Sequence, residues 1–169
     1  MKNIYILLFT LGISLVSYAQ NVKSTAYENM LKNLLSHTVP EINVEEIKVN
    51  EATESIFFLD AREKKEYVAS HIKGAIWTGY DTFKMSSVKS IPKDAKIIIY
   101  CSVGYRSEKI SEKLIKAGYK DVSNLYGGLF EWSNHQRPLV DSNNESTKKI
   151  HAYNKKWGQW IDKGEKVYN

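Results

Sequence analysis

The chain has 169 residues, of which 24 are Lys or Arg and 19 are Asp or Glu, so that its formal net charge is +5. This length allows one domain with short extensions. The lysines occur singly or in pairs, with acidic residues between them. The chain therefore lacks the long basic block that is typical of nucleic-acid-binding proteins, and we expect no nucleic-acid partner.

Residues 1–19 predict a secretory signal peptide. Lys2 supplies a positive start, residues 4–16 are mostly apolar, and Ser17-Tyr18-Ala19 has small residues where a signal peptidase reads them. We expect cleavage after Ala19 and export to the periplasm or the medium. The apolar run is shorter than the roughly 20 residues of a membrane span, so the mature chain is expected to have no stable span. An uncleaved N-terminal anchor is the alternative.

Segments of helical and strand-like pattern alternate through the middle of the chain. We expect helices over residues 24–36, 62–70, 81–88, 107–117 and 129–134. We expect a strand, or a strand and a short turn, within residues 42–49, and strands over residues 56–59, 74–77, 96–100 and 122–125. Strands that alternate with helices predict an α/β fold with a central, mainly parallel sheet flanked by helices on both faces.

The sequence changes character after Pro138. Residues 141–147 are polar and resemble a loop, whereas Tyr153, Trp157 and Trp160 recur at helical spacing. This spacing predicts a helix within residues 150–160 that docks on the core.

Cys101 is the only cysteine of the chain, so it cannot form an intramolecular disulfide. It lies between a predicted strand and a predicted helix, and ligands of parallel sheets bind beyond the carboxyl ends of strands. Unpaired N–H groups at such a turn, together with the helix dipole, stabilise a thiolate. Gly104 permits a tight turn and Arg106 can bind an oxyanion. This pattern predicts a nucleophilic thiol; a buried structural cysteine is the alternative.

Three motifs in chain order resemble the rhodanese (thiosulfate sulfurtransferase) family. The first comprises Leu59-Asp60-Ala61-Arg62, Glu66-Tyr67 and the run from His71 to Ile76. The second, Cys101 to Ser107, is similar to the family's active-site loop C-x-x-G-x-R-S, and the third, Gly127 to Trp132, to its GG-x-x-x-W ending. The resemblance covers residues 44–138, which we treat as the domain, between an N-terminal helical extension at 20–43 and a C-terminal extension at 139–169.

The resemblance implies that Cys101 accepts a sulfane sulfur as a persulfide and passes it to a thiol or to cyanide. The substrate would then be a small sulfur-containing anion or thiol, and a protein could serve as donor or acceptor. The family pattern implies substrate contacts from the loop residues Ser102, Val103, Gly104, Tyr105 and Arg106. It implies structural support from Asp60, Arg62, His71 and Ser107.

One position departs from the family. Members with strong thiosulfate activity often have a basic residue directly after the cysteine, where this chain has Ser102, and this removes one cation that would attract thiosulfate. The histidines lack the spacing of metal ligands, and we expect neither a metal nor a cofactor.

Two other functions are alternatives. One is a non-catalytic binding or regulatory module. The other is a cysteine phosphatase or arsenate reductase, but these enzymes have one more residue between Cys and Arg than the four present here.

Overall fold

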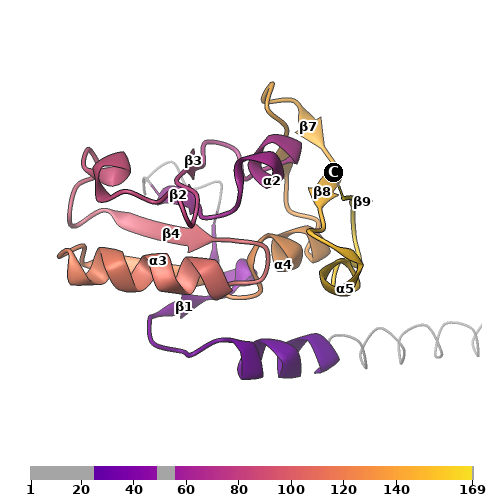
Figure 1. Ribbon diagram of the computed structural model, residues 1–169, viewed down its shortest axis with the longest axis horizontal. Helices are drawn as coiled ribbons and strands as arrows, with labels where there is room; N and C mark the ends of the chain where they lie inside the picture. The colour runs from indigo at the N-terminus through magenta and orange to yellow at the C-terminus, as the bar shows by residue number, and fades with distance from the viewer. Residues whose placement is uncertain (1–24, 49–55, 169) are drawn as a thin grey trace, which may run out of the picture. The chain divides into compact units, whose positions relative to one another are not determined.

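The computed structural model describes residues 25–48 and 56–168 (Figure 1). The predicted signal peptide lies outside the described residues. The chain divides after Leu34 into two units. The described part of the first unit is a helix over residues 25–34, within the range that the sequence predicted, with an ion pair between Lys32 and Glu28 at 2.9 Å. Among the described residues, no helix is long and apolar enough to cross a membrane.

The second unit is built on a five-stranded sheet in the order β1-β5-β4-β2-β3, in which every neighbouring pair is parallel. Its strands are β1 (Glu41–Ile42), β2 (Ile56–Asp60), β3 (Ile76–Trp77), β4 (Lys96–Tyr100) and β5 (Asp121–Leu125). This arrangement confirms the predicted α/β fold with a central, mainly parallel sheet. The strand β1 falls in residues that the sequence analysis assigned to the N-terminal extension.

Helical segments connect the strands. They are η1 (Val44–Glu46), α2 (Lys64–Ala69), η2 (Met85–Val88), α3 (Tyr105–Lys116) and α4 (Gly128–Asn134). Within residues 42–49 we expected either a strand or a strand and a short turn, and the structure has the second arrangement, because a capping box between Asn43 and Glu46 begins a 3₁₀ turn directly after β1. The helix expected over residues 81–88 is reduced to η2, because the chain first makes a turn in which Phe83 N donates to Tyr80 O.

The central strand β4 is buried on both faces. Ile97, Ile98 and Ile99 have no exposed surface, as a run of β-branched residues in the middle of a parallel sheet predicts. On one side, Ile110 and Leu114 of α3 pack against this strand in the same core cluster. The residue that follows β4 is therefore attached to the most buried part of the sheet.

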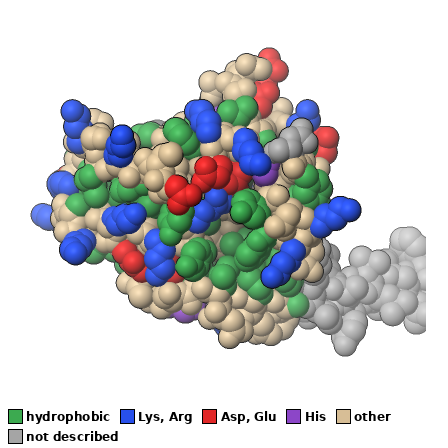
Figure 2. Space-filling view, in the orientation of Figure 1, with side chains coloured by type: hydrophobic (Ala, Val, Ile, Leu, Met, Phe, Trp, Pro, Cys, Tyr) green, Lys and Arg blue, Asp and Glu red, His purple; other side chains and the backbone are tan. Residues whose placement is uncertain are grey.

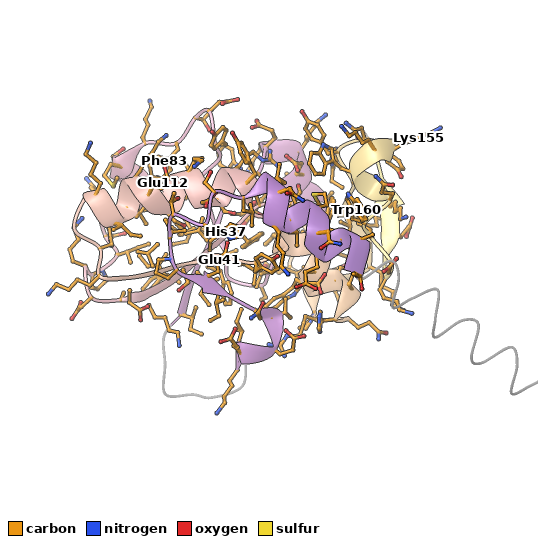
Figure 3. The ribbon with its side chains drawn as sticks, turned by 90° about the horizontal axis from the view of Figure 1, so that it is seen from below. His37, Glu41, Phe83, Glu112, Lys155 and Trp160 are labelled. Atoms are coloured by element: carbon orange, nitrogen blue, oxygen red, sulfur yellow. The ribbon has the colours of Figure 1, made fainter. Side chains whose placement is uncertain are left out.

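The C-terminal segment contains two small sheets and one helical turn. Strands β6 (Leu139–Val140) and β7 (Ser146–Thr147) are antiparallel, β8 (Lys149–His151) and β9 (Glu165–Val167) are parallel, and α5 spans Lys155–Gly158. This segment lies beside α2 and α4 (Figure 1), and Figure 3 shows its Lys155 and Trp160 at the opposite end of the sheet from Phe83 and Glu112.

The helix expected within residues 150–160 is present only as the short α5, and the first part of this range is not helical. Residues 149–151 form β8, and Tyr153 adopts a left-handed φ of 61° that no helix allows. The Asn154 side chain then accepts a hydrogen bond from Trp157 N and begins the short α5. Trp157 and Trp160 are half-buried, as expected for docking, but Tyr153 is 51% exposed.

Candidate active site

The carboxyl end of β4 places Cys101 at the edge of the sheet where ligands of parallel sheets bind. Asp60, the last residue of β2, pairs in register with Tyr100, the residue before the cysteine. The chain then turns through Gly104, whose φ is 111°, and α3 begins at Tyr105. The cysteine is free and is 1% exposed. The strand–loop–helix context that the sequence predicted for this thiol is therefore present.

The Gly104 peptide points its N–H at the sulfur. Gly104 N donates to Cys101 Sγ over 3.2 Å. The carbonyl of the same residue accepts hydrogen bonds from Asn124 Nδ2 at 3.1 Å, Ser107 Oγ at 3.0 Å and Glu108 N at 3.0 Å. These three donors fix the orientation of the turn. The sequence analysis expected support from Ser107 but not from Asn124, which lies on the neighbouring strand β5.

The surroundings of Cys101 favour its thiolate. Burial by itself would raise the pKa of this thiol, but the positive charge of Arg106 and hydrogen bonding from Ser107 and Val103 together hold the pKa below its ordinary value. A thiol at the N-terminus of a helix gains further from the helix dipole. These surroundings favour the ionised form of the thiol, which is the form that acts as a nucleophile.

The N-terminus of α4 holds the other side of the loop. Leu129 N donates to Cys101 O at 2.8 Å, and Phe130 N donates to Ser102 O at 3.1 Å. Gly128 lies so close that a Cβ atom there would be 2.5 Å from the Cys101 carbonyl oxygen. Its φ of 58° also belongs to the left-handed region. This close approach explains the second glycine of the Gly127-Gly128 pair.

Arg106 is paired with a carboxylate that the sequence analysis did not assign to the site. Arg106 Nη1 donates to Glu66 Oε2 at 2.8 Å and Nη2 to Oε1 at 2.9 Å. The Ser102 hydroxyl also donates to Glu66 Oε1, at 2.8 Å. The Glu66 side chain has no exposed surface, and although burial opposes ionisation, Arg106 lowers its pKa to about 2. The two guanidinium nitrogens of Arg106 that we expected to bind an oxyanion therefore donate to Glu66 instead.

Asp60 and Arg62 form a fully buried pair beside the site. Arg62 Nη2 lies 2.6 Å from Asp60 Oδ2 and 2.6 Å from the carbonyl oxygen of Ser70, the residue that follows α2. Trp77 Nε1 donates to the Arg62 carbonyl at 2.9 Å. The pair thus joins β2, α2 and β3, and the structural role expected for both residues remains a prediction.

His71 packs against α2. Its ring stacks on that of Tyr67 with centroids 3.9 Å apart, and its backbone pairs with Val140 of β6. The supporting role expected for His71 remains a prediction. Of the remaining loop residues, Val103 is buried and Tyr105 is 42% exposed; their contacts with substrate remain predictions.

A residue of the C-terminal segment approaches the site. The guanidinium carbon of Arg106 lies 6.0 Å from the centroid of the Tyr153 ring, at the limit of a cation–π contact. The sequence analysis had placed Tyr153 on a docking helix. No local signal links it to Arg106, since the contact depends on the left-handed turn before α5.

Charged side chains of the described residues are also present outside this site. On the face that Figure 2 shows, Lys and Arg side chains are scattered singly or in small groups. Within residues 25–48 and 56–168, no group of three His, Cys, Asp or Glu side chains could hold a metal ion.

Comparison with protein-family models gives a match to the rhodanese-like domain over residues 43–135. Among curated proteins, the tRNA uridine(34) hydroxylase of Bacillus cereus strain Q1 is 38% identical over 81 residues, which are 45% of this chain and 25% of that protein. The enzyme of the same name from Bacillus thuringiensis is 37% identical over 81 residues, again 45% and 25% of the two chains. The chain thus spans about a quarter of the length of these relatives.

Two solved structures share the fold. The thiosulfate sulfurtransferase of Pseudomonas aeruginosa has a TM-score of 0.57 at 22% identity, covering 83% of this chain and 26% of that one. A Bacillus halodurans protein has a TM-score of 0.56 at 24% identity, covering 70% of this chain and 86% of that one.

Proposed function

Because the chain belongs to the rhodanese-like domain family, we propose that it is a sulfurtransferase that carries a sulfane sulfur on Cys101 as a persulfide. The observation that carries this proposal is the hydrogen bond from Gly104 N to Cys101 Sγ at the start of α3, together with the lowered pKa of the thiol. A thiolate held by a backbone N–H attacks sulfur without a general base. The fold shared with a thiosulfate sulfurtransferase agrees with this class.

The proposed cycle has two displacements on sulfur. In the first, the Cys101 thiolate attacks the outer sulfur of the donor, the donor's S–S bond breaks, and its remainder leaves with the electron pair. The new sulfur carries the negative charge, so the N–H groups that stabilise the thiolate also stabilise the persulfide. In the second, an acceptor thiolate or cyanide attacks that outer sulfur and releases the Cys101 thiolate. No net oxidation or proton transfer is needed when the participating groups are anionic.

The names of the curated relatives describe a different activity. They are tRNA uridine(34) hydroxylases, but the match covers a quarter of their length. We assign to this chain only the domain that it shares with them and not their activity on tRNA.

The test is the intact mass of the protein after incubation with a sulfane donor. We expect one added sulfur atom, removed by cyanide with formation of thiocyanate, and no addition to the Cys101→Ser variant. Absence of the adduct with thiosulfate, alkylthiosulfonate and persulfide donors would leave the binding-module alternative. Hydrolysis of p-nitrophenyl phosphate or reduction of arsenate that depends on Cys101 would favour the phosphatase or reductase alternative instead.

We also propose that the protein is exported after removal of residues 1–19. The intact mass of protein purified from its native cells tests this, since cleavage after Ala19 gives a defined shorter chain. A mass that includes Met1 to Ala19 would contradict the proposal.

A further inference from the structure

A carboxylate of the same chain binds one edge of the Arg106 guanidinium. Two of its nitrogens donate to the two oxygens of Glu66, at 2.8 and 2.9 Å, and Nη2 also donates to Ser102 Oγ at 3.1 Å. This bidentate geometry is the one through which an arginine binds an oxyanion. Only 17% of the Arg106 side chain is exposed. A substrate anion would have to displace a buried carboxylate to use this edge.

Tyr153 lies over the face of the same guanidinium. Its ring centroid is 6.0 Å from the Arg106 guanidinium carbon. A bulky residue with a φ of 61° is strained, and strain of this kind persists where the surrounding structure enforces it. The neighbouring strand β8 packs beside α2, and Tyr153 N donates to His151 Nδ1 at 3.1 Å. The C-terminal segment thus places an aromatic, half-exposed ring beside Arg106.

The charges of Cys101, Arg106 and Glu66 do not favour a sulfur donor with two negative charges. Glu66 offsets the charge of Arg106, so a Cys101 thiolate leaves the three groups with a net negative charge. The next cation along α3, Lys109, lies 2.7 Å from Glu112 and 3.8 Å from Glu108. A donor with two negative charges would meet repulsion from the thiolate that Arg106 does not offset.

We propose that the sulfur donor is an organic sulfane compound with at most one negative charge, such as an alkylthiosulfonate or an alkyl persulfide, and that Glu66 and Tyr153 set this selectivity. The proposal rests on the sulfurtransferase function proposed above. With an alkylthiosulfonate, the thiolate attacks the outer sulfur, the S–S bond breaks, and the alkylsulfinate leaves with the electron pair. The alkyl group would lie against the Tyr153 ring. Thiosulfate has no apolar part that could make this contact.

Methanethiosulfonate and thiosulfate are the two probes that test this selectivity. Both transfer their outer sulfur, and they differ by one negative charge and a methyl group. We would measure kcat/KM for each donor with cyanide as the acceptor. The ratio of the two values in the wild type is then compared with the ratio in Glu66→Gln, which retains an oxygen for Arg106 and Ser102 but removes the charge.

The expected result is a fall of about tenfold in the methanethiosulfonate-to-thiosulfate ratio in Glu66→Gln, because an unbalanced Arg106 attracts the dianion more strongly. The thiosulfate reaction of the variant should also become more sensitive to salt. Tyr153→Ala should lower the ratio as well, whereas Tyr168→Ala, which alters a tyrosine of similar exposure beyond β9, should leave it unchanged.

The use of a ratio separates charge selection from damage to the site, because distortion lowers both rates together. An unchanged ratio in both Glu66→Gln and Tyr153→Ala would overturn the inference while the sulfurtransferase function stands. Failure of both donors to load sulfur on Cys101 of the wild type would instead count against the sulfurtransferase function itself.

Discussion

Replacement of Gly128 by alanine tests how tightly α4 holds the loop that follows Cys101. The new Cβ would lie 2.5 Å from the Cys101 carbonyl oxygen and 2.8 Å from the Ser102 carbonyl carbon, both of them backbone atoms that cannot rotate away. Residue 128 would also have to keep a φ of 58°, which is unfavourable for a residue with a Cβ by about 1–2 kcal/mol.

The shift needed to relieve this contact would weaken two further interactions. The hydrogen bonds from Leu129 N to Cys101 O and from Phe130 N to Ser102 O each contribute about 1 kcal/mol. We therefore expect Gly128→Ala to lower the free energy of unfolding by roughly 3–4 kcal/mol, since the backbone strain and the lost hydrogen bonds act together.

Gly118→Ala is the matched control. Gly118 has a φ of 87°, but a Cβ there would meet no atom within 4 Å. Urea unfolding of both variants should give a loss of about 1–2 kcal/mol for Gly118→Ala, from the left-handed backbone alone. If Gly128→Ala is no less stable than Gly118→Ala, close approach to the loop is not the reason for the glycine.

Three further predictions concern buried charges near the site. The rate of Cys101 alkylation should reach half its maximum at a lower pH than the rate for a free thiol. Because the pKa of Cys101 is depressed in the folded state, the thiolate contributes stability above the unfolded pKa, and this contribution is lost as the pH falls through the folded pKa. The difference in free energy of unfolding between the wild type and Cys101→Ala should therefore shrink in acid. Glu66, with a pKa lowered from 4.5 to about 2, should contribute roughly 3 kcal/mol above pH 4.5 and lose it as the pH falls toward 2, so Glu66→Gln should flatten this acid limb of urea unfolding. Asp60→Ala should lower the free energy of unfolding by about 3–5 kcal/mol, because it leaves the Arg62 charge buried without its partner; a loss below about 1 kcal/mol in the same assay would contradict this.

The parts of the fold that were predicted correctly rest on local patterns. Four consecutive apolar residues before Cys101 predicted the buried strand β4, and its observed range, Lys96–Tyr100, is the range expected. The amphipathic pattern of α3 was equally clear, although the helix begins two residues earlier than predicted, at Tyr105. Because the loop lies between these two elements, the position of the thiol could be predicted as well.

The parts that were missed depend on contacts between distant residues. Glu66 lies in a charged segment whose pattern is typical of a solvent-exposed helix. Its burial depends on the ion pair with Arg106, which is 40 positions away in the chain. Asn124 supports Gly104 across 20 positions. Tyr153 was misplaced because three aromatic residues at helical spacing outweighed the asparagine after it, which caps a later and shorter helix.

The packing of the C-terminal segment has a consequence for where the chain can be cut. The family match ends at residue 135, yet five apolar side chains beyond it are at least 94% buried: Leu139, Val140, Ile150, Ala152 and Ile161. Asn134 of α4 also donates to the carbonyl of Trp160 at 3.0 Å. A recombinant fragment that stops at the family boundary would be prone to aggregation, and a premature stop codon in this region would give a product that cellular proteases remove. We therefore expect the smallest piece that folds independently to extend through β9.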